Sequence, residues 1–210
     1  MGDTARRAFI AAVLFEGGLG ALALVLGFLL GVNPLRTLEL HGPGLLQGIA
    51  ATLPMLLAFG LLLGIDAPPL VRIRRILDEV IGSFFVRCST LQLAVVAAVA
   101  GLGEEVLFRG LIQGYLQTVI DTGPALLSAS ALFGLVHPLT RAYVVLAGLF
   151  GLYLGWLWLV TENLLVPVLA HGLYDFIALG ALVRQYRRRP GQPPHSTQMP
   201  DRPEWNGRTD

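Results

Sequence analysis

The sequence contains no lysine, and charged residues of any kind are scarce. All fifteen basic residues are arginine, fourteen residues are acidic, and charged residues make up only 14% of the 210 residues. Because 54% of the residues are hydrophobic and the mean hydropathy is +0.67, the composition excludes an ordinary soluble domain. The net charge of +1 says little about partners, since its distribution along the chain matters more. A composition without lysine is typical of a GC-rich genome, so we expect a prokaryotic protein.

Cysteine is nearly absent, and one motif of hydrolytic enzymes is missing. The single cysteine, Cys88, excludes an internal disulfide and any cysteine-based metal cluster. No Gly-x-Ser-x-Gly run is present, and Ser128 and Ser130 lie in a run of small residues that suits close helix packing. A serine intramembrane protease is therefore disfavoured.

Long apolar runs dominate the rest of the chain. A hydrocarbon core of about 30 Å requires about 20 helical residues, and on this measure we predict six spans, the fourth of them short. They cover roughly residues 8–32, 45–64, 91–119, 124–139, 142–160 and 164–183. The first run is too long for the core of a cleaved signal peptide, so we interpret it as an uncleaved anchor. The sequence thus predicts an all-α membrane protein, a polytopic bundle of about six transmembrane helices that forms a single transmembrane domain over residues 1–184.

The segment from Leu70 to Arg87 has a different pattern. Its apolar residues recur with a helical period, and its arginines and acidic residues take the other face. This pattern predicts an amphipathic helix in the cytoplasmic headgroup layer, with arginine side chains that reach lipid phosphates. The alternative is a soluble-type cytoplasmic turn packed on the bundle.

Arginine is distributed unevenly between the two sides that six spans would create. Both chain ends and the loops on one side carry many arginines, whereas the opposite loops hold only Arg36. We therefore expect both termini to be cytoplasmic in a multi-pass protein of the cell membrane. Residues 185–210, rich in proline and polar residues, are expected to form a disordered cytoplasmic tail.

Two acidic residues and an arginine interrupt the third apolar run. A charge near the bilayer centre costs at least ~2.5–3.5 kcal/mol, so such residues persist mainly where they have a function. Glu105 and Arg109 are four residues apart on one helical face and are expected to form an ion pair. Glu104 points about 100° away from Glu105 and is less able to share the arginine, which makes Glu104 the better candidate for a general base. A purely structural Glu-Glu-Arg cluster is the alternative.

Glu16, in the first run, is interpreted as a carboxylate near the interface, with an accessory role inside the bundle as the alternative.

Histidines occur in two of the later apolar runs. His137 ends the fourth, where it serves either as a cap or in catalysis. His171 and Asp175 are four residues apart in the sixth, so Asp175 orients the imidazole, binds a metal ion together with it, or only makes a hydrogen bond within the helix. With a rise of ~1.5 Å per residue, the depths of Glu104, His137 and His171 agree within about 10 Å, which is compatible with one site near the midplane.

Three motifs occur in order along the chain: EEVLFRG from Glu104, FGLVH from Phe133 and HGLYD from His171. This trio resembles the E-E-x-x-x-R, F-x-x-x-H and H-x-x-x-Asn/Asp motifs of the CAAX protease and bacteriocin-processing (CPBP, or Abi) family, intramembrane endopeptidases that include Ras-converting-enzyme-like proteins. The resemblance covers roughly residues 91–183. The first two predicted spans and the tail carry no matching motif.

The resemblance implies a polytopic peptidase that cleaves near the end of a membrane-associated peptide or protein. Glu104 and His137 take the positions that activate water in this family. His171 and Asp175 take the positions assigned to oxyanion stabilisation or to metal ligation. The supporting positions of the motifs are Glu105, Arg109 and Phe133.

Cofactor and partners follow from the same resemblance. An ionised Asp175 would repel an oxyanion, which gives more weight to an orienting role or to a divalent metal ion such as Zn. The metal ligands would then be Glu104, His137, His171 and Asp175. A metal-dependent and a metal-free glutamate mechanism both stay open here. We expect membrane lipid and a peptide or protein substrate as partners, and no nucleic acid.

Two other functions are compatible with buried ionisable residues. One is a transporter or channel that uses them as a proton or ion relay. The other is a non-catalytic membrane protein that serves as a scaffold or in immunity to a secreted peptide. The order of the three motifs favours the protease, whose substrate stays open between prenylated C-terminal tails, bacteriocin leader peptides and other membrane peptides.

Overall fold

The chain is all-helical, as the sequence predicts. The computed structural model describes residues 3–188, and no strand occurs among them. The helices are α1 (Asp3–Leu30), α2 (Gly42–Gly64), α3 (Pro68–Val80), the π-helical segment η1 (Ile81–Phe85), α4 (Thr90–Glu105), the π-helical segment η2 (Val106–Gln113), α5 (Gly114–Leu116), α6 (Thr122–Leu135), α7 (Arg141–Thr161) and α8 (Leu165–Arg187).

Within the described part of the chain, five helical stretches are long and apolar enough to cross a membrane. They are α1, α2, the continuous stretch 90–116 that joins α4, η2 and α5, and the helices α7 and α8. The fourth predicted span corresponds to α6, a shorter apolar helix. Large apolar side chains such as Phe28 on α1 and Leu46 on α2 are exposed on the outside of the bundle, as expected for surfaces that face lipid. The chain is therefore an integral membrane protein. The predicted disordered tail, residues 185–210, begins too early, because α8 continues to Arg187. The part of the tail from residue 189 lies outside the described residues.

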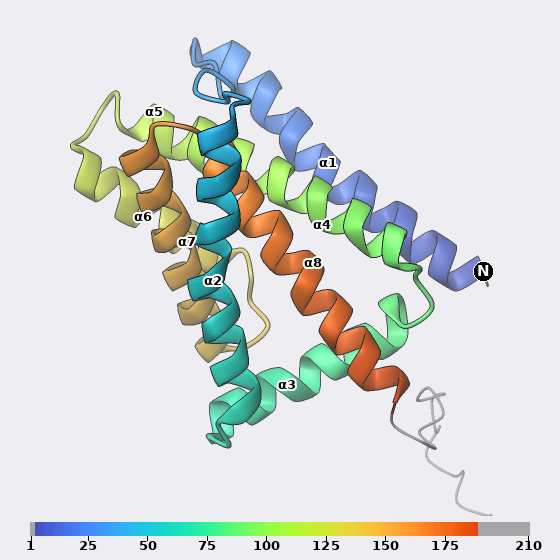
Figure 1. The fold of residues 1–210 in the computed structure, drawn as a ribbon. Coiled ribbons are helices and arrows are strands. Elements are labelled where there is room, and N and C mark those ends of the chain that lie inside the picture. Colours follow the sequence, from blue (N-terminus) through green and yellow to red (C-terminus); the bar gives the residue numbers. More distant parts are fainter. Residues whose placement is uncertain (1–2, 189–210) are drawn as a thin grey trace, which may run out of the picture.

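Helix α4 lies at the centre of the arrangement. It packs between α1 and α8, while α2 packs on α8 and α6 pairs with α7 (Figure 1). Small residues allow the close approach of α1 and α4: a Cβ at Gly103 would overlap the carbonyl oxygen of Glu16, and a Cβ at Gly20 would lie 3.3 Å from the Cα of Gly103. The first motif therefore sits on the most enclosed helix of the bundle.

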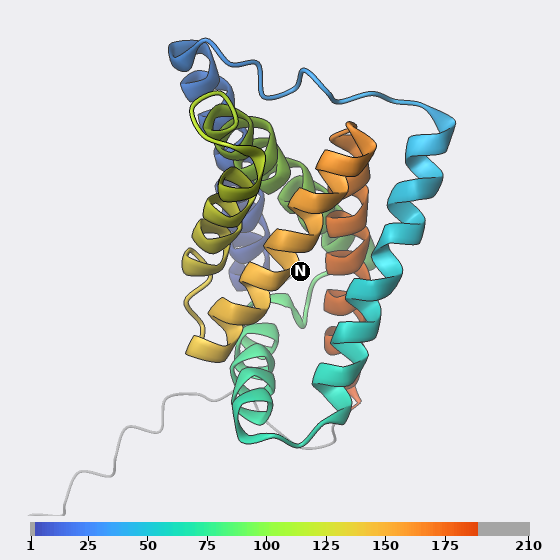
Figure 2. The same ribbon diagram turned by 90° about the vertical axis from the view of Figure 1, so that its left-hand side faces the viewer.

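A long connection, residues 31–41, crosses one end of the bundle (Figure 2). It begins at Gly31, whose positive φ of 68° ends α1. Buried Asn163 then holds the connection in place, because its side-chain amide bonds both the N–H and the C=O of Glu39 and also contacts His41. His41 in turn caps α2 by accepting a hydrogen bond from the Gly44 N–H at 3.0 Å.

The amphipathic segment forms α3, which crosses the other end of the bundle (Figure 1). Its apolar face packs on the bundle, with Ile73 buried in a cluster that includes Phe59 and Leu182. Arg74 does not extend to the lipid phosphates that we predicted for it. Its guanidinium instead donates to the carbonyls that end α2, the shortest bond being 2.7 Å to Leu63, and pairs with Asp66 at 2.6 Å.

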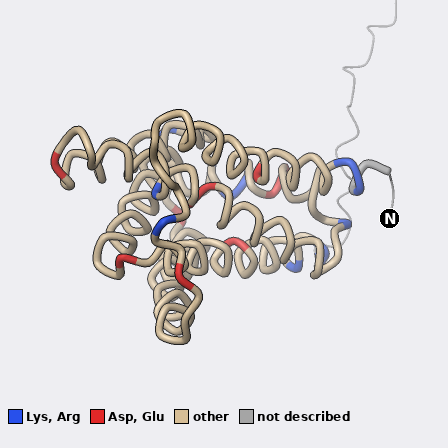
Figure 3. The backbone as a smooth tube through the Cα atoms, turned by 90° about the horizontal axis from the view of Figure 1, so that it is seen from above, with Lys and Arg blue, Asp and Glu red and all other residues tan. Residues whose placement is uncertain are grey.

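The α3 end of the bundle also carries most of the charge outside the spans. The start of α7 and the last turn of α8 lie near α3 in Figures 1 and 2, and α1 contacts η1, the segment that follows α3. Most positions along the tube are uncharged (Figure 3). Arg187 ties the end of α8 to the segment before α4, since it donates to the carbonyls of Val86 and Cys88, each at 2.8 Å.

Candidate functional site

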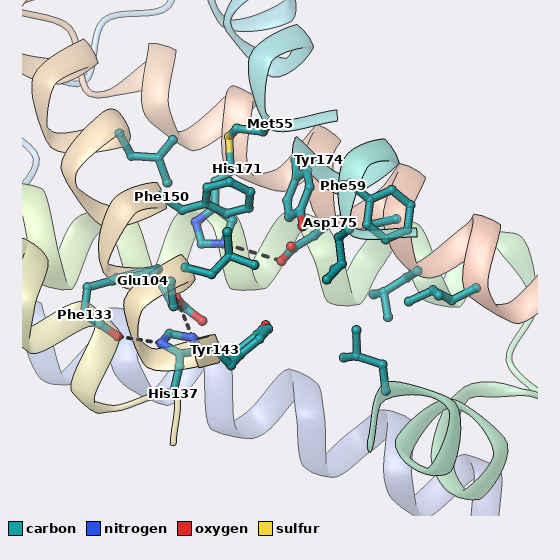
Figure 4. A pocket seen from close by; sticks show the side chains of 18 residues that line it. Met55, Phe59, Glu104, Phe133, His137, Tyr143, Phe150, His171, Tyr174 and Asp175 are labelled. Atoms are coloured by element: carbon teal, nitrogen blue, oxygen red, sulfur yellow. Dashed lines mark hydrogen bonds and ion pairs between the residues drawn. The ribbon is translucent and has the colours of Figure 1, made fainter. Parts of the chain in front are cut away.

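A cavity of about 180 Å³ lies between α2, α4, α7 and α8, and α3 contributes Leu77 to its wall. Polar side chains from all three motifs line it. They are Glu104, His137, His171 and Asp175, joined by Tyr143 and Tyr174 (Figure 4). The remaining wall is apolar and extends toward α3. Stretches of chain far apart in sequence thus meet in one chamber inside the bundle.

Glu104 and His137 face each other across this cavity. Glu104 is the next-to-last residue of α4, and His137 follows α6 directly. The Nε2 of His137 lies 3.7 Å from the Glu104 Oε2, and its Nδ1 lies 2.7 Å from the carbonyl oxygen of Phe133 (Figure 4). Because a carbonyl oxygen only accepts, Nδ1 donates its proton to Phe133, and Nε2 is the ring nitrogen that faces Glu104. At 3.7 Å the two atoms leave no space for a water molecule between them, but one water beside them can contact both.

His171 lies between two carboxyl groups. Its Nδ1 is 2.8 Å from the Glu105 Oε1, and its Nε2 is 3.5 Å from the Asp175 Oδ2. The predicted pairing of His171 with Asp175 is therefore present. The contact with Glu105 comes from a different helix, and the helical spacings within α8 gave no sign of it.

Arg109 does not line the cavity but binds residues that support it. The predicted ion pair with Glu105 is present, with Nη1 2.9 Å from Oε1, and both side chains are fully buried. The second guanidinium nitrogen donates to the carbonyl of Gly151 on α7 at 2.8 Å. The Phe133 ring lies 4.6 Å from the guanidinium carbon, so it covers the ion pair and also borders His137. Glu105, Arg109 and Phe133 thus form a packed support behind the cavity.

A second polar contact between η2 and α7 was not predicted from the sequence. Gln113 follows Arg109 by four residues, is completely buried and donates to the Gly155 carbonyl at 3.4 Å. Gly155 itself follows Gly151 by four, so two side chains of η2 reach two carbonyls of α7 in register. The spacing of Gln113 from Arg109 was a signal that could have found it.

Three further residues beside the site were also missed or interpreted differently. Tyr143 and Tyr174 line the cavity, and only their nearness to the motif residues in sequence could have indicated it. Glu16, interpreted as an interfacial carboxylate, instead interacts electrostatically with Glu104, and its Oε2 is buried. The close contact of α1 with Gly103 places it there.

The arrangement of the donor atoms does not fit a metal ion. Within residues 3–188, no group of three or more histidine, cysteine, aspartate or glutamate side chains is arranged to hold one. Both ring nitrogens of His171 face carboxyl oxygens, and Nδ1 of His137 is bound to a backbone carbonyl. One free imidazole nitrogen and one carboxyl, from His137 and Glu104, are fewer ligands than a catalytic zinc site uses.

Comparison with known proteins adds the family. Residues 87–177 match the family model described as Rce1-like, type II CAAX prenyl endopeptidase Rce1-like. This region of the chain is Rce1-like. It begins just before α4, ends inside α8 and contains all three motifs, so the resemblance stated from the motifs is confirmed. No curated protein and no solved structure gives a significant match.

Proposed function

We propose that the chain is an intramembrane endopeptidase of the CAAX-processing kind, which hydrolyses a peptide bond in a membrane-associated protein or peptide. The observation that carries the proposal is the placement of Glu104 and His137 on one cavity, where the Glu104 Oε2 and the His137 Nε2 lie 3.7 Å apart, close enough to contact the same water molecule. The Rce1-like match supports the reaction class independently.

The chemistry requires only side chains of this chain and water. Glu104 takes a proton from the water while the water oxygen bonds to the carbonyl carbon, and the carbonyl π electrons move to its oxygen. The Nε2 of His137 accepts a hydrogen bond from the second water hydrogen. When the tetrahedral intermediate collapses, the C–N bond breaks and the nitrogen leaves with the proton that Glu104 holds. Glu104 is thereby returned to its starting form.

His171 borders the same space and is proposed to hold the substrate carbonyl, with Asp175 orienting its ring. Glu105 fixes the ring orientation of His171, and Arg109 fixes that of Glu105. Because the donor set does not fit a metal ion, we favour the glutamate-type mechanism over the metal-dependent one. The apolar wall toward α3, with Met55, Phe59 and Leu77, suits a lipidated C-terminal tail as substrate.

The test compares the wild type with Glu104→Gln. Purified full-length protein in nanodiscs receives two internally quenched peptides of identical sequence, one with an isoprenylated cysteine and one without. We expect the wild type to cleave the isoprenylated peptide and Glu104→Gln to lower kcat by about 10²–10⁴-fold, the range for loss of a general base. In parallel, terminal proteomics on cells with either protein identifies natural cleavage sites.

Controls separate this result from other outcomes. Glu79→Gln makes the same chemical change on the exposed face of α3 and should keep full activity. Exhaustive chelation should leave the wild-type rate unchanged. Full activity of Glu104→Gln would remove the base assignment, whereas ion flux that depends on Glu104 without any hydrolysis would identify a transporter.

A further inference from the structure

The site lacks a clear hydrogen-bond donor on the side of the cavity near His137. A tetrahedral intermediate carries a negative charge on oxygen, and donors aimed at that oxygen stabilise it strongly. Ionised Glu104 and Asp175 only accept hydrogen bonds. The Nδ1–H of His137 is already directed at the Phe133 carbonyl. Of the predicted catalytic residues, only His171 is left as a donor, and its Nε2 is directed at Asp175.

Tyr143 offers an uncharged donor at this place. It lies in the first turn of α7, where its backbone N–H donates to the Thr140 hydroxyl at 3.0 Å, so the start of the helix is fixed. Its ring centre lies 6.5 Å from that of His137. The hydroxyl is directed into the cavity in Figure 4 and interacts electrostatically with both Asp175 and Glu104.

The hydroxyl of Tyr143 has no hydrogen-bond partner among the described residues, which distinguishes it from a structural tyrosine. Tyr153, on the same helix, shows the contrast, because its hydroxyl donates to the Ala51 carbonyl at 2.9 Å and joins α7 to α2. A buried tyrosine hydroxyl usually finds a partner. An unpaired one that opens into a cavity between two catalytic candidates is available for a ligand.

We propose that Tyr143 is a further catalytic residue, whose hydroxyl donates a hydrogen bond to the substrate carbonyl oxygen as it becomes an oxyanion. This inference rests on the proposed peptidase function. The oxyanion would lie between Tyr143 on one side and His171 on the other, with the attacking water held by Glu104 and His137. A neutral donor from α7 also offsets the repulsion that Asp175 would exert on the oxyanion.

The experiment is a comparison of Tyr143→Phe with the wild type on the isoprenylated reporter peptide, using full-length protein in nanodiscs. The substitution removes one oxygen atom and keeps the ring beside His137. We expect kcat to fall by about 10²-fold, as for loss of one oxyanion donor, with KM changed by less than about threefold. The thermal unfolding midpoint should stay that of the wild type.

A matched control and the Glu104→Gln variant distinguish the possible results for Tyr143→Phe. Tyr115→Phe, on α5 away from the cavity, is the matched control and should keep the wild-type kcat. Wild-type kcat in Tyr143→Phe, together with an inactive Glu104→Gln, would overturn the role of Tyr143 and leave the peptidase intact. A rise in KM alone, or a lower unfolding midpoint with unchanged kcat, would also overturn it. Absence of cleavage by the wild type would overturn both proposals.

Discussion

Arg109 shows how one residue makes the ionised site compatible with a membrane interior. Its guanidinium spreads two bonds over Glu105 and the Gly151 carbonyl, and the Phe133 ring covers one face. Glu105 can then hold the Nδ1 of His171 without leaving an uncompensated buried charge. Three helices therefore depend on a single side chain for their polar contacts.

Removal of this side chain should be costly. Arg109→Leu leaves Glu105 buried without its cation, so we expect the free energy of unfolding to fall by about 3–5 kcal/mol. Arg109→Lys retains the charge but loses the two-pronged hydrogen bonding of the guanidinium. Its free energy of unfolding should lie between those of the wild type and Arg109→Leu. Unfolding in mixed micelles, followed by circular dichroism, measures the difference. Arg75→Leu, on the exposed face of α3, serves as control, and equal stability of Arg109→Leu and Arg75→Leu would contradict the anchoring role.

At the residue scale, spacing within one helix was the reliable guide. The i, i+4 rule correctly paired Glu105 with Arg109 and His171 with Asp175. Contacts between helices had no such signal, so the bond from Glu105 to His171 and the place of Glu16 beside Glu104 emerged only from the packing. A sequence periodicity describes which face a residue occupies, but not which neighbour that face meets.

At the scale of the element, the contact of α1 with α4 decides what surrounds Glu104. The two helices meet where Gly103 allows the backbone of Glu16 to approach, one residue before the proposed base. The following segment η2 is π-helical, a form frequent at functional sites, and it brings Arg109 and Gln113 toward α7.

A methyl group at this contact should disturb both packing and activity. In Gly103→Ala the added Cβ overlaps the Glu16 carbonyl oxygen, so α1 must move outward. Overpacking of this kind costs about 1–3 kcal/mol, and we expect a lower unfolding midpoint together with a reduced kcat. Gly18→Ala is the matched control, because no atom lies within 4 Å of its Cβ position. Unchanged activity in Gly103→Ala would show that α1 does not position Glu104.

The helices themselves were largely predictable, because apolar runs of membrane length leave the backbone few alternatives to helix. Their irregularities were not. No residue pattern in Val106–Gln113 announces a π-helical segment, and the short α6 gave the weakest of the six predicted spans. The amphipathic pattern correctly predicted a helix at α3. It did not predict the partner of Arg74, which binds the carbonyl end of α2 and does not extend to lipid phosphates.

At the scale of the whole molecule, the arginine distribution separates the two ends of the bundle. The α3 end carries the arginines of α3 and of the helix termini, whereas the connection 31–41 at the opposite end carries only Arg36. With the cytoplasmic side of bacterial membrane proteins rich in arginine and lysine, we expect the α3 end to face the cytoplasm.

Cysteine labelling can test this orientation. Cys88 is the only cysteine, and it is buried; burial raises the pKa of its thiol, so it reacts slowly. In a Cys88→Ser background, a membrane-impermeant maleimide should label Glu39→Cys in intact cells. It should label Glu79→Cys only after the membrane is opened. The reverse pattern would invert the orientation.

The close packing of α1 on α4 limits how much of the chain can be removed without exposing Glu104. The Rce1-like region starts at residue 87, more than fifty residues after α1 ends, yet the wall behind Glu104 is built partly from α1. A fragment limited to residues 87–177 would lack the α1 backbone that packs on Gly103 beside Glu104, and it would also lack the α2 residues that line the cavity. The smallest piece that keeps the packing around Glu104 must therefore retain α1, which serves as a structural support for the site as well as a membrane span.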